Sequence, residues 1–341
     1  MTIKTRITEE FGIEYPIISA PMGPFYTTEL AIAASEAGGL GVVSHATLQG
    51  KNPIEDFKAQ LDYVVEHTDK PFGCNIRTAR VQTDHRILLR KLPEWRDEDP
   101  RLKEQLIYTL TSAGGPRKAA AMWQKKAPDM YHFHVGPALW LVDKIVGSGC
   151  DGIVATGTEG GGHQSYEKIS TLVLTQQVAR KYPDKLLVTC GGYSSPEGVA
   201  AGLAMGADAV AMGTRFIAST QSEFHQNYKD LIPPATARDT VLTTGGFGPI
   251  RLLKNKYAIE HGKVISKQEK IEQEHSFSVD EYLEDLHHYE IVYTEGDVEN
   301  GAIPVGQTAG LIDDIRDVDD IISTYTKEAE KLMKDVCSKI S

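Results

Sequence analysis

GIVATGTEGGGH, residues 152–163, joins a short apolar run to a glycine-rich loop that ends in a histidine. The run from Gly152 to Ala155 predicts a strand that is buried on both faces. The glycines at 160–162 tolerate positive φ and let the backbone approach a ligand closely. An imidazole at the end of such a loop, His163, is suited to exchange protons near neutral pH. The other interpretation is an ordinary glycine turn beside a surface histidine.

Seven further apolar runs of similar length predict strands at 16–22, 40–46, 72–77, 106–113, 130–135, 186–192 and 209–216. Helix signals lie between them, at 27–38, 115–129, 136–149, 170–184 and 195–208. Alternation of strand and helix predicts a parallel sheet, and eight such units predict closure into a (β/α)8 TIM barrel. An open doubly wound sheet is the alternative. No GxGxxG follows the first predicted strand, so we favour the barrel.

Two segments interrupt this regularity and set the predicted domain organisation. The stretch 78–105 is a long insert after strand three, either a lid or a solvated helical insert. The stretch 226–300 is expected to be a mainly helical insert packed on the barrel, an extension after strand eight. The barrel itself is then formed by 1–225 and 301–341.

The composition excludes several classes of protein. The 341 residues carry a net charge of −11, which argues against a nucleic-acid-binding role. No apolar run is long enough to span a membrane, and the N-terminus lacks an apolar signal core, so a cytoplasmic location is expected. The four cysteines are widely spaced and form no CxxC pair, so we expect neither disulfides nor a metal site.

Glycines and polar residues follow the predicted strands on one rim of the barrel, where TIM-barrel chemistry takes place. Gly191 and Gly192 end strand seven, and Gly213 and Thr214 end strand eight, as in a phosphate site built from the last two loops. Ordinary turn glycines are the alternative for either pair. A phosphate there and a planar ring over the barrel mouth would suit flavin mononucleotide (FMN), with an amide offered by Asn75.

The chain resembles the nitronate monooxygenase family, FMN-dependent TIM-barrel enzymes related to flavin enoyl-acyl-carrier-protein reductases. The resemblance rests on YPIISAPM (15–22), EAGGLGVVS (36–44), KPFGCN (70–75), GTEGGGH (157–163), ISTLVL (169–174), GVAAGLAMGADAVAMGTRF (198–216) and VGQTAGLIDDI (305–315). It implies that His163 is the catalytic base, and leaves NAD(P)H open as reductant. It also implies an FMN site, which we assign to Ala20, Pro21, Met22, Asn75, Glu159, Gly161, Gly162, Gly191, Gly192, Gly213 and Thr214.

The sequence departs from the family pattern after the histidine, where it reads Gln164-Ser165-Tyr166-Glu167. We expect substrate contacts from His45, Arg77, His134, Gln164 and Ser165. The basic side chains are candidates to bind an anionic or coenzyme A-linked substrate, with surface ion pairs as the alternative: Arg77, Arg80, Arg90, Lys91 and Arg251. His132 and His134 alternate on strand five and are expected to line the barrel interior.

Three functions remain open from the sequence. The first is oxidation of an alkyl nitronate or nitroalkane with O2, with His163 as base. The second is oxidation or reduction of an acyl-CoA or other anionic enoyl thioester on the same scaffold. The third is a flavin-binding protein without turnover. The expected partner is a small-molecule substrate, with no nucleic acid and no membrane, and a homo-oligomer is left open.

Overall fold

Eight parallel strands form one sheet in the computed structural model, which describes residues 3–45, 52–79, 84–245, 248–262, 264, 266–276 and 279–339. Their order is β1-β9-β8-β6-β5-β4-β3-β2, and a bridge between Ile18 and Leu40 connects the two ends. The fold is therefore the predicted TIM barrel. The strands are β1 (Ile17–Ser19), β2 (Gly41–Val43), β3 (Phe72–Arg77), β4 (Leu106–Ser112), β5 (Tyr131–Gly136), β6 (Gly152–Thr156), β8 (Leu186–Cys190) and β9 (Ala209–Met212).

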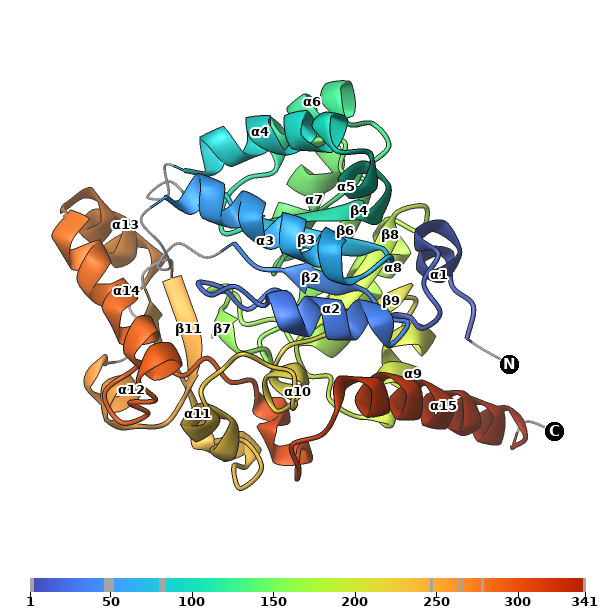
Figure 1. Ribbon diagram of the computed structural model, residues 1–341. Helices are drawn as coiled ribbons and strands as arrows, with labels where there is room; N and C mark the ends of the chain where they lie inside the picture. Colours follow the sequence, from blue (N-terminus) through green and yellow to red (C-terminus); the bar gives the residue numbers. More distant parts are fainter. Residues whose placement is uncertain are drawn as a thin grey trace.

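The barrel interior is filled by alternate residues of these strands. One buried cluster takes Ile18, Val42, Leu110, Phe133 and Val154 from different strands, together with residues of the other barrel strands and of α1 (Arg6–Phe11). Phe11 of α1 packs its ring against Tyr108, Tyr131 and Phe133. Helix α1 therefore closes the N-terminal end of the barrel, on the side opposite β11, α13 and α14 (Figure 1).

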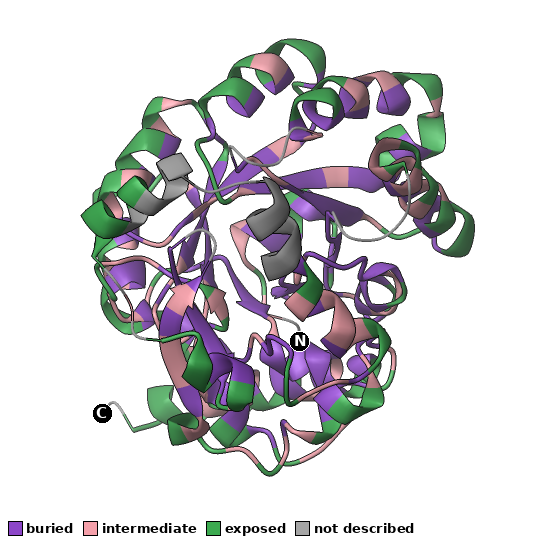
Figure 2. Cartoon of the chain, turned by 90° about the vertical axis from the view of Figure 1, so that its left-hand side faces the viewer, coloured by how far each residue is buried: buried purple, intermediate pink, exposed green. Residues whose placement is uncertain are grey.

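Helices cover the outside of the barrel, and their outward faces are exposed while the strands are buried (Figure 2). Side-chain caps start two of them: Ser170 accepts from the N–H of Val173, and Ser195 accepts from that of Gly198. The covering helices are α2 (Thr28–Glu36), α3 (Pro53–His67), α4 (His85–Glu98), α5 (Pro100–Gln105), α6 (Arg117–Lys126), α7 (Leu139–Gly147), α8 (Thr171–Lys181), α9 (Pro196–Ala204) and α15 (Val318–Cys337). None of the helices in the described ranges is long and apolar enough to cross a membrane.

The last helix, α15, completes the barrel although it lies far from it in sequence. Its buried residues Val318, Ile321, Ile322, Tyr325 and Ala329 repeat at helical spacing and form one apolar stripe. This stripe packs against α2 and α9. The return of 301–341 to the barrel therefore agrees with the predicted domain organisation.

The long segment after β3 forms α4 and α5, so its helical interpretation is correct. Helix α4 buries Leu88, Leu89, Leu92 and Trp95 in the same cluster as residues of α3 and β3. This helix is therefore part of the barrel's outer layer and not a lid over its mouth.

The extension after β9 differs from the mainly helical expectation. It contains the helices α11 (Gln226–Asp230), α12 (Lys256–Glu260), α13 (Lys267–Ser276) and α14 (Val279–Thr294). Its residues 240–253, however, form an antiparallel hairpin of β10 (Thr240–Gly245) and β11 (Gly248–Leu253). Strand β11 also pairs with β7 (Gly162–His163), which belongs to the loop after β6. A three-stranded sheet thus joins the extension to the barrel (Figure 1).

The two histidines of β5 point away from the barrel interior, contrary to expectation. Tyr131, Phe133 and Val135 are the residues of β5 that pack in the interior cluster. The His132 ring lies 4.8 Å from the ring of Trp123 in α6. Because alternate residues of a strand share a face, His132 and His134 both lie between the sheet and its helices.

Candidate active site

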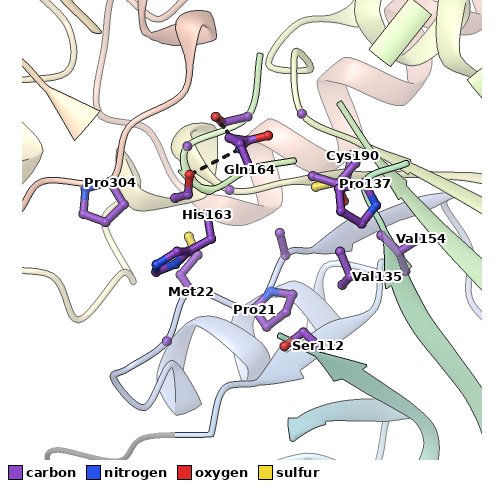
Figure 3. Close-up of a pocket in the computed structure, with 18 of the residues that line it drawn as sticks. Pro21, Met22, Ser112, Val135, Pro137, Val154, His163, Gln164, Cys190 and Pro304 are labelled. Carbon is purple, nitrogen blue, oxygen red and sulfur yellow. Dashed lines mark hydrogen bonds between the residues drawn. The ribbon is translucent and has the colours of Figure 1, made fainter. Parts of the chain in front are cut away.

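A cavity of about 590 Å³ opens at the C-terminal ends of the barrel strands. Its floor is the upper part of the barrel interior, including Ile18, Tyr108, Leu110 and Val154. In Figure 3, His163 and Met22 lie at one end of the view of this cavity, and Val135 and Val154 lie at the other. The cavity stands where TIM-barrel enzymes hold their reactants.

Two consecutive glycines form a concave stretch of backbone at the end of β8. Gly191 and Gly192 have φ values of 86° and 92°, a conformation that residues with a Cβ rarely adopt. A Cβ on Gly191 would lie 2.9 Å from the carbonyl oxygen of Gly157 and 3.0 Å from the nitrogen of Gly160. Successive backbone N–H groups in such a turn attract anions. The structure therefore offers an anion cradle at this edge of the cavity.

The loop before α15 closes the same side of the cavity. The N–H of Gly306 donates to Thr214 Oγ1 over 3.0 Å, and the N–H of Gln307 donates to the carbonyl oxygen of Glu159. A Cβ on Gly161 would lie 2.8 Å from the nitrogen of Gly306. Close backbone contact between the loops after β6 and β9 and the C-terminal segment therefore requires glycine here.

Asn75 lies at the cavity floor with a fixed amide. Its Nδ2 donates to the carbonyl oxygen of Leu110 over 3.0 Å and to Ser112 Oγ over 3.1 Å. Both amide hydrogens are thus engaged inside the barrel, which leaves the carbonyl oxygen Oδ1 to a ligand. The sequence predicted the residue correctly at the cavity, and the structure narrows the group it offers to a hydrogen-bond acceptor.

His163 is held over the cavity by strand pairing and not by a free loop. His163 pairs with Ile250 of β11, Gly162 pairs with Arg251, and the N–H of Gln164 donates to the carbonyl oxygen of Pro249 over 2.7 Å. Gly162 has a φ of 78°, which turns the chain into this pairing. The imidazole is exposed at the cavity wall, where a reactant can meet it.

Arg251 fixes the same loop from behind. Its Nε donates to the carbonyl oxygen of Thr158 over 2.9 Å, and its Nη1 donates to Thr240 Oγ1 over 3.0 Å. Burial lowers the pKa of this guanidinium, although Glu159 opposes the shift. Arg251 does not line the cavity, so its expected contact with an anionic substrate is wrong and its contacts are structural.

Gln164 and Ser165 both line the cavity, as expected. The Gln164 Nε2 donates to the carbonyl oxygen of Gly160 over 2.8 Å, which braces the glycine loop (Figure 3). The Gln164 side chain is 7% exposed, and its Oε1 is buried without a hydrogen-bond partner among the described residues. This oxygen is an acceptor that a bound ligand can satisfy.

Arg77 and His45 lie next to each other, but only Arg77 lines the cavity. His45 Nδ1 accepts from the N–H of Arg77 over 3.3 Å, so its Nε2 carries the proton that it donates to Asp84 Oδ2 over 2.8 Å. Burial lowers the pKa of His45 even though Asp84 opposes the shift. His45 is therefore a positioning group and not the substrate contact that we expected.

Other expected contacts also lie elsewhere. Glu159 is not in the cavity wall: its carboxylate accepts from the N–H and the hydroxyl of Thr171. Arg90 and Lys91 lie on α4 and do not line the cavity, and Lys91 pairs with Glu94. Arg80 falls outside the described residues. The remaining predicted residues line the cavity: Ala20, Pro21, Met22, Asn75, Arg77, His134, Gly161, Gly162, His163, Gln164, Ser165, Gly191, Gly192, Gly213 and Thr214.

The sequence analysis missed most of the apolar wall. It includes Phe25 after β1 and a set of residues from the extension and its flanks: Ile217, Phe224, Tyr228, Ile250, Leu286, Tyr289 and Pro304. One signal was available for the hairpin that supplies Ile250. Alternating apolar and polar residues flank a glycine pair at 240–253, which is typical of a β-hairpin.

Two titratable side chains in the cavity wall are neutral near pH 7. Burial raises the pKa of the Cys190 thiol to about 11. Burial also lowers the pKa of the His134 imidazole to about 4, although a hydrogen bond to the Gly114 carbonyl opposes the shift. His134 is therefore unsuited to exchange protons near neutral pH.

A TIM barrel with an anion cradle after its last strands and an exposed imidazole over its mouth defines a barrel enzyme. A sequence profile described as nitronate monooxygenase matches residues 4–328. The chain belongs to the nitronate monooxygenase family, and it is an FMN-dependent oxidoreductase, as the sequence resemblance predicted.

Individual relatives differ in what they are named for. A Mycobacterium tuberculosis protein named (3aS,4S,5R,7aS)-5-hydroxy-7a-methyl-1-oxo-octahydro-1H-indene-4-carboxyl-CoA dehydrogenase is 27% identical over 96% of this chain and 97% of its own. A nitronate monooxygenase of Paraburkholderia phytofirmans is 28% identical over 75% of this chain and 78% of its own. The solved structure of FabK from Thermotoga maritima is 31% identical, with a TM-score of 0.83 over 99% of this chain and 100% of that one.

Proposed function

We propose that the protein transfers a hydride and a proton at the α and β carbons of an acyl thioester, with FMN as its cofactor. The observation that carries this proposal is the apolar wall that the extension adds to the cavity, including Phe224, Tyr228 and Tyr289. A nitroalkane needs no such wall, whereas an acyl chain gains free energy from burial against it. The similarity to a carboxyl-CoA dehydrogenase over nearly the whole of both chains supports the same substrate class.

The residues at the cavity fit FMN. Gly191 and Gly192 offer their N–H groups to the phosphate, and Gly213 and Thr214 line the cavity on the neighbouring strand end. Asn75 Oδ1 and the buried Gln164 Oε1 are acceptors without partners inside the barrel loops, suited to the N–H and hydroxyl groups of the cofactor. When bound, FMN supplies hydride transfer to or from the β carbon.

His163 moves the proton in this proposal. For reduction of an enoyl thioester, the α carbon takes a proton from the protonated imidazole while the β carbon takes a hydride. For oxidation of the saturated thioester, the neutral imidazole removes the α proton while a hydride leaves the β carbon. The exposed position of His163 on the cavity wall suits either direction. Arg77 brings a positive charge to the same wall and stabilises negative charge on the thioester oxygen.

An anaerobic flavin spectrum tests the proposal. The FMN-loaded enzyme is reduced with light and mixed with crotonyl-CoA, and the expected result is rapid reoxidation of the flavin. His163→Gln is expected to slow this reoxidation by about a hundredfold, the usual worth of a positioned acid or base. Lys181→Gln, on the far side of α8 from the cavity, is the control and should react like the wild type. No reoxidation by any enoyl thioester would overturn the proposal.

Nitronate oxidation is the second candidate, favoured by the family match over 4–328 and by the exposed His163. A base of moderate pKa removes the proton beside a nitro group by the same geometry that serves a thioester. Anaerobic reduction of the oxidised flavin by propionate 3-nitronate would support this candidate. The two substrates are compared by kcat/KM, and the larger value decides between them.

A further inference from the structure

Trp140 lies at the rim of the cavity and is 45% exposed, which is high for so large an apolar side chain. It belongs to α7, one helical turn before Lys144. The Nζ of Lys144 lies 4.7 Å from the centre of the indole ring. The Nζ of Lys267, at the start of α13, lies 5.3 Å from the same ring. An aromatic face and two ammonium groups therefore meet where the cavity opens.

The contact is too weak to explain these residues as a structural element. An exposed ammonium–indole contact contributes roughly 0.5–1 kcal/mol. Neither lysine has a carboxylate within 4.0 Å in the described part of the chain, and the neighbouring Asp143 is paired with Lys181 instead. In a chain with a net charge of −11, two cations at one rim create a local site for an anion.

We propose that Trp140, Lys144 and Lys267 form a subsite for the adenosine phosphate end of a nucleotide-linked reactant. The purine stacks on the indole, and the ammonium groups turn from the ring to the phosphates. The subsite rests on the proposed function in one respect: the reactive end of the same molecule reaches His163 through the cavity that Trp140 borders. Two reactants carry this chemistry, a coenzyme A thioester and NAD(P)H.

The placement on two separate segments gives the subsite a further property. Lys144 comes from a barrel helix, and Lys267 comes from the extension that also supplies the apolar wall. The charge of the rim and the wall of the cavity are therefore set by the same segment. Among the charged side chains described in the cavity wall, Glu167 is the carboxylate that would oppose a phosphate.

Calorimetric titration of the FMN-loaded full chain tests the subsite without turnover. The probes are adenosine 3′,5′-bisphosphate, which is the nucleotide part of coenzyme A, and adenosine 2′,5′-bisphosphate, which is that of NADPH. We expect Trp140→Ala to weaken binding about tenfold or more, the usual loss of a stacked base, and Trp140→Phe to retain most of it. Lys144→Gln and Lys267→Gln should each weaken binding about threefold and reduce its dependence on salt.

Lys181→Gln is the matched control, because Lys181 lies 5.5 Å from the Tyr182 ring in the same kind of contact but away from the cavity. It should leave both affinities unchanged. Binding of neither probe, or equal affinities in the wild type and Trp140→Ala, would overturn the inference. Stronger binding of the first probe assigns the subsite to the thioester, and stronger binding of the second assigns it to the reductant.

The outcome is independent of the proposed activity. Should no thioester react while Trp140-dependent nucleotide binding is found, the subsite stands and the proposed function falls. Should crotonyl-CoA and crotonyl-pantetheine react with equal kcat/KM and neither probe bind, the function stands and the subsite falls.

Discussion

Thr111 Oγ1 lies 2.7 Å from His134 Nδ1 and joins the imidazole to a chain of buried hydrogen bonds. His134 Nε2 faces the carbonyl oxygen of Gly114, so it carries the proton and Nδ1 must accept from the hydroxyl. Thr111 Oγ1 has one hydrogen to give, so His132 Nε2, at 2.8 Å, must donate to it. The Sγ–H of Cys150, 3.6 Å from His132 Nδ1, can then donate to that atom. These contacts fix the tautomers of both histidines and tie β4 to β5 behind the cavity.

Thr111→Val removes the centre of this chain, and we expect it to lower the free energy of unfolding by about 3 kcal/mol. Both buried imidazoles lose a partner, and each unsatisfied polar group costs roughly 1–3 kcal/mol. Thr109→Val is the control, since Thr109 is equally buried on β4 but makes a single bond, to the carbonyl oxygen of Tyr131. Chemical denaturation of the two variants measures the difference. Equal losses would contradict the shared role of Thr111.

The same histidines make stability depend on pH. Burial lowers the pKa of His134 to about 4 and that of His132 to about 3, from an ordinary value of 6.5. The unfolded chain therefore binds more protons than the folded chain below about pH 6.5, and the free energy of unfolding falls as pH falls. At about pH 5 the two contribute a loss of about 2 kcal/mol each.

Denaturation between about pH 8 and pH 5 measures this slope. His134→Gln removes one titrating group and is expected to flatten the slope by about half, although it lowers stability at pH 8. A slope unchanged by His134→Gln would assign the acid sensitivity to other groups.

Arg251 is expected to govern turnover through the position of His163. Arg251→Met breaks the bonds to the Thr158 carbonyl and to Thr240 Oγ1, and so loosens the loop that pairs with β11. We expect kcat to fall about tenfold to a hundredfold, because misplacing a catalytic group by about 1 Å has effects of that size. KM should change little, since Arg251 does not line the cavity.

Arg251→Lys keeps one donor and should recover part of kcat. A purely structural role would instead lower the amount of folded, FMN-loaded protein and leave kcat per bound flavin unchanged. The ratio of activity to bound flavin therefore decides between the two.

The contrast between Arg251 and Gly191 explains how much the sequence could predict. The barrel strands and the glycine turns depend on local signals, namely short apolar runs and residues that tolerate positive φ, so Gly191 was placed correctly. The direction of Arg251 depends on the register of β11 against β7, because a shift of one residue moves a side chain to the other face of a strand. Ile250, one residue earlier, is the one that lines the cavity. No local pattern reports such a pairing between distant segments.

Gly191→Ala is expected to prevent FMN from binding while the barrel still folds. An alanine at a φ of 86° is strained, and its Cβ would press against the Gly157 carbonyl and the Gly160 nitrogen, so the cradle must move. Gly115→Ala, in the loop after β4, is the control, because no atom lies within 4 Å of the added Cβ. Both variants are purified in excess FMN, and bound flavin is measured by absorbance after gel filtration, with circular dichroism as the check on folding. Full occupancy in folded Gly191→Ala would place the phosphate elsewhere on the rim.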